Sequence, residues 1–171
     1  MFNFFRPNFE TSVRRELPML YRVARRLTSS AEDAEDLVSQ TLVSAYRGWH
    51  TFDGKYLRSW LVRILRNERG ALSSEKNLMA EIEDLAEHPD DYTTWDQVAA
   101  KLESEDIRRE IDLLPLHFKL PVLLCDVEQL SYEEASQALD IPIGTVRSRL
   151  NRGRNQLKRK LFHWTREEIR P

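Results

Sequence analysis

The stretch that decides the fold runs from Leu130 to Leu161 and reads LSYEEASQALDIPIGTVRSRLNRGRNQLKRKL. Ser131, followed three residues later by Glu134, forms a capping box that predicts a short helix over residues 132–139. The next residues, DIPIG, break the helical pattern, and Pro142 suits the cap or first turn of a second, longer helix. A short helix, a tight turn and a basic helix are typical of a helix-turn-helix, whose second helix enters the DNA major groove.

The second helix of this stretch has two distinct faces when its residues are placed at 100° steps. The apolar stripe consists of Val146, Leu150, Leu157 and Leu161. Arginine pairs bidentately with guanine and asparagine with adenine, while serine and threonine suit phosphates or bases. The polar residues that we identify as a DNA-reading set are Thr145, Arg147, Ser148, Asn151, Arg152 and Asn155. Arg147 lies on a flank of the polar face, as does Arg149, and Arg159 lies opposite the apolar stripe further along. A solvated basic face on an ordinary core helix is the alternative, but cap, turn and two-faced helix occur here together.

The charge of the chain is segregated along its length. The 171 residues carry a formal net charge of −2, with about +4 in residues 1–80, −9 in residues 81–112 and +3 in residues 113–171. Two basic ends around an acidic segment suggest two modules that face nucleic acid, joined by a linker that does not bind it. The single cysteine, Cys125, excludes an intrachain disulfide framework and lies in an apolar run, so we expect a small core residue in a reducing compartment. No apolar run approaches a membrane span or has a signal-peptide layout, which predicts a cytoplasmic protein.

The N-terminal module is predicted to contain three helices, over residues 8–27, 31–47 and 57–72. Pro18 either kinks the first helix or marks its true start, and Ser30 with Asp33 caps the second. The second helix has a buried stripe of Ala34, Leu37, Val38, Thr41 and Ala45. Its outward face carries Asp36, Ser39, Gln40, Val43 and Arg47. Val43 among polar residues is either an isolated exposed valine or the apolar anchor of a surface that binds a protein partner.

Aromatic and basic residues alternate in the loop between the second and third helices. The set consists of Trp49, Phe52, Tyr56 and Trp60 with Arg47, Lys55 and Arg58. Aromatic faces beside cations stack unpaired bases, but Trp49, Phe52 and Trp60 equally suit a core cap, and we favour that reading for Trp60. Tyr56 is the better ligand candidate. The third helix is predicted to turn Arg63, Arg66 and Arg69 outward, with Asn67 at the edge, as phosphate contacts or as merely solvated side chains.

The rest of the chain provides a linker and a second core. Residues 73–106 are acidic and contain Ser73-Ser74 and HPDD breaks, with short helices possible around 78–86 and 95–102. Residues 107–128 supply apolar mass, and Pro115 and Pro121 are predicted to set helix starts. The chain has no glycine-rich phosphate loop and no Cys/His metal spacing. We therefore expect an all-α protein of two small helical domains, without cofactor or metal, that is not an enzyme.

These segments resemble a known family. The run LYRVARRLTSSAEDAEDLVSQTLVSAYRGWHTFD followed by LRSWLVRILRNE resembles region two of bacterial sigma factors of the extracytoplasmic-function (ECF) group. LSYEEA with IPIGTVRSRL resembles sigma region four. The implied domains are 8–75, similar to region two, an acidic linker over 76–106, and 107–165, similar to region four. The implied function is to direct RNA polymerase to promoters and to support promoter opening.

The resemblance also implies partners and roles. Polymerase core would bind through the clamp helices of its largest subunit, at Asp36, Ser39, Gln40 and Val43, and through the flap of its second-largest subunit. The upstream, minus-thirty-five promoter element would be read by Arg147, Ser148, Asn151 and Arg152. The downstream, minus-ten element would be held as single strand, with one base flipped out, by Phe52, Lys55, Tyr56, Arg58, Arg63, Arg66 and Asn67. An anti-sigma factor would sequester the chain.

Two other functions fit parts of the sequence. An autonomous helix-turn-helix regulator that binds palindromic sites as a dimer explains the C-terminal module but leaves residues 18–75 without a role. An all-helical enzyme would use the carboxylates at positions 32, 33, 35 and 36, but these lie at a helix N-terminus, where the helix dipole already explains them.

Overall fold

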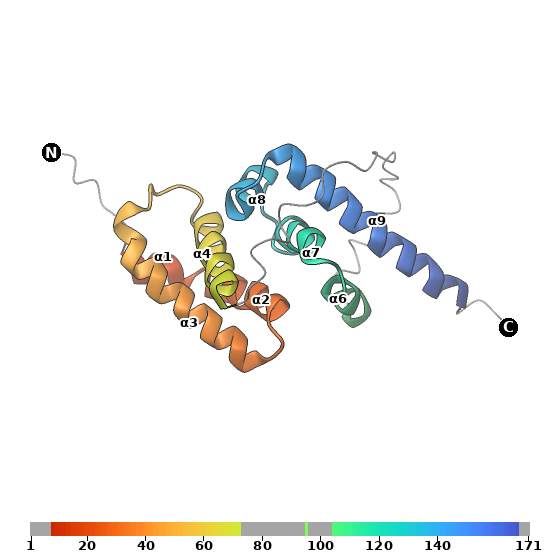
Figure 1. Cartoon of the computed structure of the whole chain (residues 1–171), viewed down its shortest axis with the longest axis horizontal. Helices are drawn as coiled ribbons and strands as arrows, with labels where there is room; N and C mark the ends of the chain where they lie inside the picture. Colours follow the sequence, from red (N-terminus) through yellow and green to blue (C-terminus); the bar gives the residue numbers. More distant parts are fainter. Residues whose placement is uncertain (1–7, 73–94, 96–103, 168–171) are drawn as a thin grey trace. The chain divides into compact units, whose positions relative to one another are not determined.

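The computed structural model describes residues 8–72, 95 and 104–167 (Figure 1). Regular structure in these residues is helical throughout, with no strand among them, which confirms the all-α expectation. They form two compact units, called here the first unit, which consists mainly of residues 8–72, and the second unit, which consists mainly of residues 95 and 104–167. The short helices predicted around residues 78–86 and 95–102 lie outside the described residues, apart from Trp95 itself.

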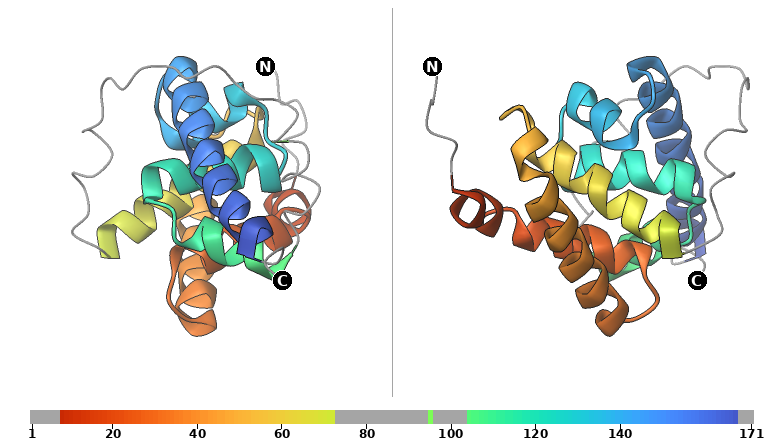
Figure 2. Two further views of the ribbon diagram at one scale, coloured as in Figure 1. Left: turned by 90° about the vertical axis from the view of Figure 1, so that its right-hand side faces the viewer. Right: turned by 60° about the vertical axis from the view of Figure 1, so that its left-hand side comes forward.

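The described residues of the first unit form four α-helices and one 3-10 turn. Their bounds are α1 Phe9–Arg14, α2 Leu17–Leu27, α3 Ala31–Gly48, the 3-10 turn η1 Trp49–Thr51, and α4 Leu57–Leu72. Helices α2, α3 and α4 pack against one another (Figure 2). Four fully buried leucines, at positions 20, 37, 61 and 65, lie at their meeting point. Each such side chain contributes roughly 1.5–3 kcal/mol by leaving water.

The predicted first helix over residues 8–27 is in fact two helices. Helix α1 ends at Arg14, and α2 begins at Leu17 with Pro18 in its first turn. Proline lacks an N–H group and its ring clashes with the carbonyl four residues earlier, so a proline in a helix interior kinks or breaks the helix, whereas one in the first turn does not. Pro18 is therefore the start signal of α2, which was one of the two readings open from the sequence.

Helices α3 and α4 begin and end close to the predicted residues. The hydroxyl of Ser30 accepts a hydrogen bond from the Asp33 N–H at 3.0 Å, as the predicted cap requires. Ala34, Leu37, Thr41 and Ala45 are buried along α3 as predicted, and Val38 is half-buried. Thr41 is accommodated in the core because its hydroxyl donates to the Leu37 carbonyl at 2.7 Å.

The second unit carries the helix-turn-helix. Its elements are α6 Glu105–Asp112, α7 Leu116–Val122, the π-helical turn η2 Leu123–Val127, α8 Tyr132–Leu139 and α9 Ile143–Glu167. Helix α9 packs mainly on α7 and also touches α6. Ile107, Ile111, Leu120, Leu124, Leu150 and Leu157 are fully buried there. The side chain of Leu161, the last predicted member of the apolar stripe, lies outside what the structure describes.

The two prolines of the second unit behave differently from each other. Pro115 precedes α7 as its cap residue, as predicted. Pro121 lies inside α7 rather than at a helix start, so that prediction is wrong. The helix continues for one more residue and then widens into the π-helical turn. Proline has no N–H group, so one backbone hydrogen bond of the helix is missing at Pro121. Beyond it, the π-helical turn pairs N–H groups with carbonyls five residues earlier.

The predicted capping box and tight turn are both present. The Ser131 N–H donates to the Glu134 carboxylate at 2.8 Å, and the Glu134 N–H donates to the Ser131 hydroxyl at 3.1 Å. Between α8 and α9, Asp140 adopts a left-handed conformation with φ of 56°. Aspartate tolerates that region better than most residues, which allows the chain to reverse within a few residues.

Candidate nucleic-acid interface

Helix α9 separates an inward face from an outward face, as its sequence predicts. Val146, Leu150 and Leu157 are each at most 1% exposed. Arg147 and Ser148 are exposed, and the remaining members of the predicted reading set are half-buried: Thr145, Asn151, Arg152 and Asn155. The Asn155 amide donates to the Asn151 side-chain oxygen at 3.3 Å, so these two amides act as a pair.

Some basic side chains of α9 are paired or buried within the second unit. Arg154 forms two hydrogen bonds with the Asp126 carboxylate, at 3.1 and 2.7 Å. Lys160 pairs with Glu110 at 2.7 Å, and Arg149 is only 9% exposed. Periodicity places these residues on or near the polar half of the helix, but it does not report which of them meet a carboxylate. Among the α9 side chains that the structure describes, the exposed basic ones are Arg147, Arg159 and the paired Lys160.

Three residues that the sequence reading did not single out support α9. Gly153 lies where a Cβ atom would come within 2.8 Å of Val122 Cγ2 and 3.2 Å of the Phe118 carbonyl oxygen. Asp126 neutralises Arg154, and Trp95 stacks on the same guanidinium, whose Cζ lies 4.9 Å from a ring centroid of the indole. Two of them could have been noticed in the sequence: Gly153 is a glycine inside a predicted helix, and Trp95 is a single tryptophan in an acidic segment.

The aromatic loop of the first unit forms a cluster, with one residue left outside it. The rings of Trp49 and Phe52 stack with 5.1 Å between their centroids, and the ring centroids of Phe52 and Trp60 are 4.9 Å apart. Phe9 of α1 closes the cluster against Trp49 at 5.2 Å. This supports the core-cap reading for those rings. Tyr56 is 46% exposed and has a φ of 50°, so its ring is presented to solvent from a strained backbone.

The basic residues around this loop differ in their availability. The side chain of Lys55 is exposed, whereas Arg58 forms an ion pair with Glu16 at 3.6 Å. Asn67 is exposed on α4, whereas Arg63 and Arg66 on the same helix were predicted to face outward but are half-buried. The prediction that Arg69 faces outward is wrong. Its Nε donates to the Leu27 carbonyl at 2.9 Å, which satisfies a carbonyl left open at the end of α2.

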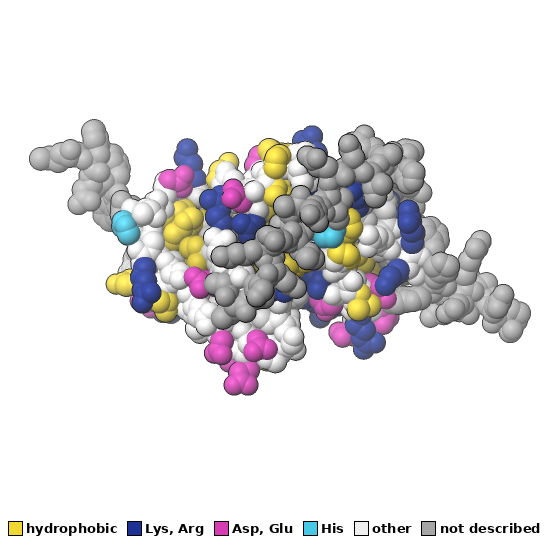
Figure 3. Space-filling view, in the orientation of Figure 1, with side chains coloured by type: hydrophobic (Ala, Val, Ile, Leu, Met, Phe, Trp, Pro, Cys, Tyr) yellow, Lys and Arg dark blue, Asp and Glu magenta, His cyan; other side chains and the backbone are white. Residues whose placement is uncertain are grey.

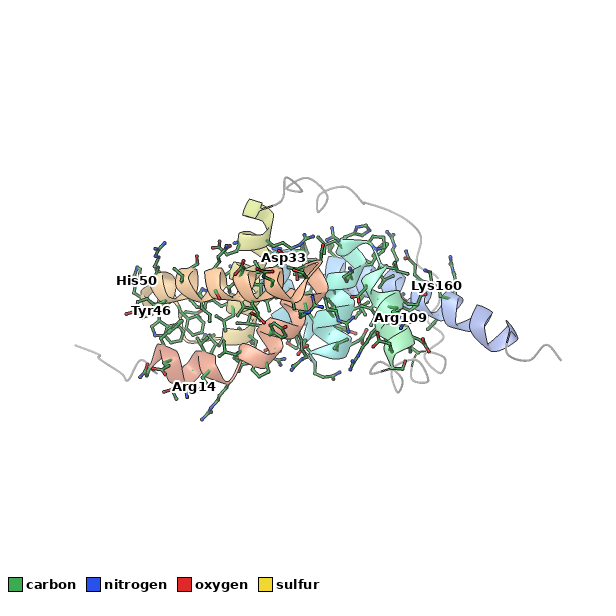
Figure 4. The ribbon with its side chains drawn as sticks, turned by 90° about the horizontal axis from the view of Figure 1, so that it is seen from below. Arg14, Asp33, Tyr46, His50, Arg109 and Lys160 are labelled. Carbon is green, nitrogen blue, oxygen red and sulfur yellow. The ribbon has the colours of Figure 1, made fainter. Side chains whose placement is uncertain are left out.

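The outward face of α3 is open along its length. Asp36, Ser39 and Gln40 are exposed, and Val43 is 50% exposed. Tyr46, one turn beyond Val43, is 69% exposed although its ring meets Phe9 edge to face at 5.4 Å. Figure 4 shows Tyr46 and His50 near the C-terminal end of α3. Polar groups and two apolar side chains therefore share one continuous helix face.

The remaining titratable groups of the described residues do not form a catalytic arrangement. The carboxylates at positions 32, 33, 35 and 36 are exposed at the N-terminal end of α3, where acidic side chains gather (Figure 3). Among the described residues no group of His, Cys, Asp and Glu has the geometry of a metal site. Burial raises the pKa of the Cys125 thiol to about 12, which keeps it protonated. None of the described helices is both long and apolar enough to cross a membrane.

Comparison with known proteins accounts for both units. The family described as Sigma-70 region 2 matches residues 12–69, and the family described as Sigma-70, region 4 matches residues 104–157. The chain is 35% identical over 161 residues to the ECF RNA polymerase sigma factor SigE of Mycolicibacterium smegmatis, an alignment that covers 89% of this chain and 61% of that protein. It is 32% identical over 148 residues to the ECF RNA polymerase sigma factor EcfG of Rhodopseudomonas palustris, covering 85% and 81%.

Solved structures agree with these sequence relatives. The sigma factor RpoE of Bartonella quintana, crystallised with the anti-sigma factor NepR, has a TM-score of 0.66 and 32% sequence identity, covering 90% of this chain and 96% of that one. CnrH, solved in complex with the cytosolic domain of CnrY, has the same TM-score at 24% identity and supports the fold alone. A bundle that matches region 2 and a helix-turn-helix unit that matches region 4 define a promoter-recognition protein of the sigma-70 type. The chain belongs to the ECF group of RNA polymerase sigma factors.

Proposed function

We propose that the second unit reads duplex DNA of the upstream, minus-thirty-five promoter element through α9. The observation that carries this proposal is the division of α9 into a buried apolar stripe and an outward face that holds Arg147, Ser148 and Arg152. Arginine reads guanine and asparagine reads adenine in the major groove. Thr145, Asn151 and Asn155 complete the proposed contact set.

The first unit takes the downstream, minus-ten element as single-stranded DNA. Tyr56 offers an exposed ring for base stacking, and Lys55 a nearby cation for the backbone. The exposed amide of Asn67 can pair with the edge of a base that leaves the stack, and Arg63 and Arg66 neutralise phosphates. Phe52 supports the loop from within the aromatic cluster, and Arg58 contributes its charge only if its pairing with Glu16 is exchanged for a phosphate.

The α3 face binds RNA polymerase. Asp36, Ser39, Gln40 and Val43 lie outward along this helix, which supports docking on the clamp helices of the largest polymerase subunit. The second unit would meet the flap of the second-largest subunit. Two weak DNA contacts tethered to one polymerase then act as a single specific site, because the second contact forms at a high effective concentration.

The chain divides into domains over residues 8–75 and 107–165, joined by the acidic linker over 76–106. Negative charge on the linker discourages it from lying along DNA. The protein itself catalyses no reaction, since polymerase performs the chemistry, and it works in the cytoplasm. The similar RpoE chain was solved with the anti-sigma factor NepR, and an anti-sigma factor would likewise sequester this chain.

Run-off transcription with core polymerase over a randomised promoter library tests the proposal. The expected result is enrichment of two short sequence elements at a fixed spacing, and it requires both units. A gel shift with duplex promoter distinguishes the autonomous regulator. Tight, sequence-specific binding by the free chain, without polymerase, would favour that regulator over the proposed function.

A further inference from the structure

Trp95 is the only residue between Leu72 and Ser104 that the structure describes, and it is 7% exposed. Its indole lies over the guanidinium of Arg154, with 4.9 Å between the Arg154 Cζ and a ring centroid. The indole also lies near the Asp126 carboxylate and favours its charged form. Trp95 thus belongs to the segment between the two units in sequence, but it is part of the second unit in structure.

Arg154 joins Trp95 to the helix-turn-helix. Its guanidinium donates twice to Asp126, at 3.1 and 2.7 Å, and the Tyr132 side chain lies near enough to stabilise its charge as well. Burial disfavours the charge of Arg154, but the bond and charge of Asp126 outweigh burial and raise its pKa. Arg154 is therefore a fixed cation, and a partly desolvated cation holds an aromatic face more strongly than a solvated one.

Tyr132 carries the connection to the exposed end of α9. It is the first residue of α8, and the capping box of Ser131 and Glu134 fixes its position. The Cζ of Arg147 lies 5.7 Å from the centroid of the Tyr132 ring. A guanidinium that rests on an aromatic face has fewer orientations than one in water, so Tyr132 limits where Arg147 points.

We propose that Trp95 is a positioning residue for promoter reading, which orients Arg147 through Arg154 and Tyr132. The inference rests on the proposed function, in which Arg147 contacts a base of the upstream element. It assigns Trp95, which lies outside both matched family regions, to the upstream reader, although Trp95 itself touches no base.

The chain of contacts predicts an effect on selectivity rather than on total binding. Without the indole, Arg154 keeps its hydrogen bonds to Asp126 but loses the ring that covers the other side of its guanidinium. The side chains of Tyr132 and Arg147 can then adopt more orientations. Arg147 therefore discriminates less well between the correct base pair and the other base pairs at its position. We expect Trp95→Ala to lower preference at that base pair by about threefold to tenfold, a factor in the range of one cation–π contact.

The experiment uses the full chain with core polymerase and promoters in which each position of the upstream element is varied singly. The variants are Trp95→Ala, Trp95→Phe, Arg147→Ala and, as a matched control, Leu113→Ala, which removes an apolar side chain of the second unit that is 69% exposed. Preference is taken as the ratio of transcripts between promoters, which does not depend on the fraction of folded protein.

The expected result is that Trp95→Ala and Arg147→Ala flatten preference at the same base pair. Trp95→Phe, which keeps the ring face, should retain most of it, and Leu113→Ala should retain all of it. Equal loss on every promoter, or unchanged ratios for Trp95→Ala while Arg147→Ala alters them, would overturn the positioning role and leave the proposed function standing. Unchanged ratios for Arg147→Ala would overturn its assignment as a base reader, and the positioning role with it.

Discussion

Gly153→Ala tests how closely α9 must approach α7. An added Cβ would lie 2.8 Å from Val122 Cγ2 and 3.2 Å from the Phe118 carbonyl oxygen. Val122 is β-branched and stiff at χ1, and the second neighbour is backbone, so neither can turn away. The two helices must therefore move apart by a few tenths of an ångström along a buried contact.

Two opposing effects set the size of the change. Alanine favours a helix over glycine by roughly 0.5–1 kcal/mol, whereas overpacking a core costs about 1–3 kcal/mol. The steric effect is the larger, because the closest approach is shorter than Cβ atoms tolerate. We expect the free energy of unfolding of the second unit to fall by about 1 kcal/mol, the difference between the midpoints of the two ranges.

Hydrogen exchange of the α7 and α9 amides measures this loss in the second unit alone. Gly144→Ala is the matched control, since Gly144 lies in the same helix with nothing within 4 Å of an added Cβ. It should leave protection unchanged or slightly raised. Protection in Gly153→Ala equal to that in Gly144→Ala would refute the close-approach reasoning.

Four further changes have defined outcomes. Arg152→Ala should cost about 1–3 kcal/mol at one upstream base pair in competitive transcription; uniform weakening over all sequences would make it a phosphate contact. Asn67→Ala should relax discrimination at the flipped downstream base in an open-complex assay. Unchanged base preference would contradict the proposal that the Asn67 amide pairs with this base. Ser131→Ala should lower stability in denaturant by about 1 kcal/mol through loss of the α8 cap; an unchanged unfolding midpoint would contradict it. Burial raises the pKa of Cys125 from 9.0 to about 12, so the unfolded thiol ionises first and stability should fall as pH rises between these values, less so in Cys125→Ala. Parallel pH profiles of the two proteins would exclude that contribution.

Local sequence signals predicted the helices of this protein well. The capping box at Ser131 and Glu134, the Ser30 cap and the apolar stripe that includes Val146, Leu150 and Leu157 each depend on residues a few positions apart. Such patterns determine helix starts and buried faces without knowledge of the tertiary structure. The exposed α3 face followed from the same periodicity, as did the exposure of Arg147 and Ser148 on α9.

The features that sequence reading missed depend on partners far along the chain. Arg69 turns inward because an open carbonyl at Leu27 lies within its reach. Arg154 hydrogen-bonds to Asp126, twenty-eight residues earlier in the chain, and the Trp95 ring packs on the same guanidinium. A basic residue on a polar helix face has the same local pattern whether it meets DNA or a carboxylate. Only the packed structure distinguishes the two.

The wide turn over Leu123–Val127 has a consequence for comparing related chains. The Glu128 N–H donates to the Leu123 carbonyl, five residues earlier, at 2.9 Å. Such a turn holds one residue more than an α-helical turn, and Leu123, Leu124 and Cys125 are all buried within it. A homologue with an ordinary turn here aligns correctly only across a one-residue gap. An ungapped alignment would pair buried positions with exposed ones and misreport which of them are free to vary.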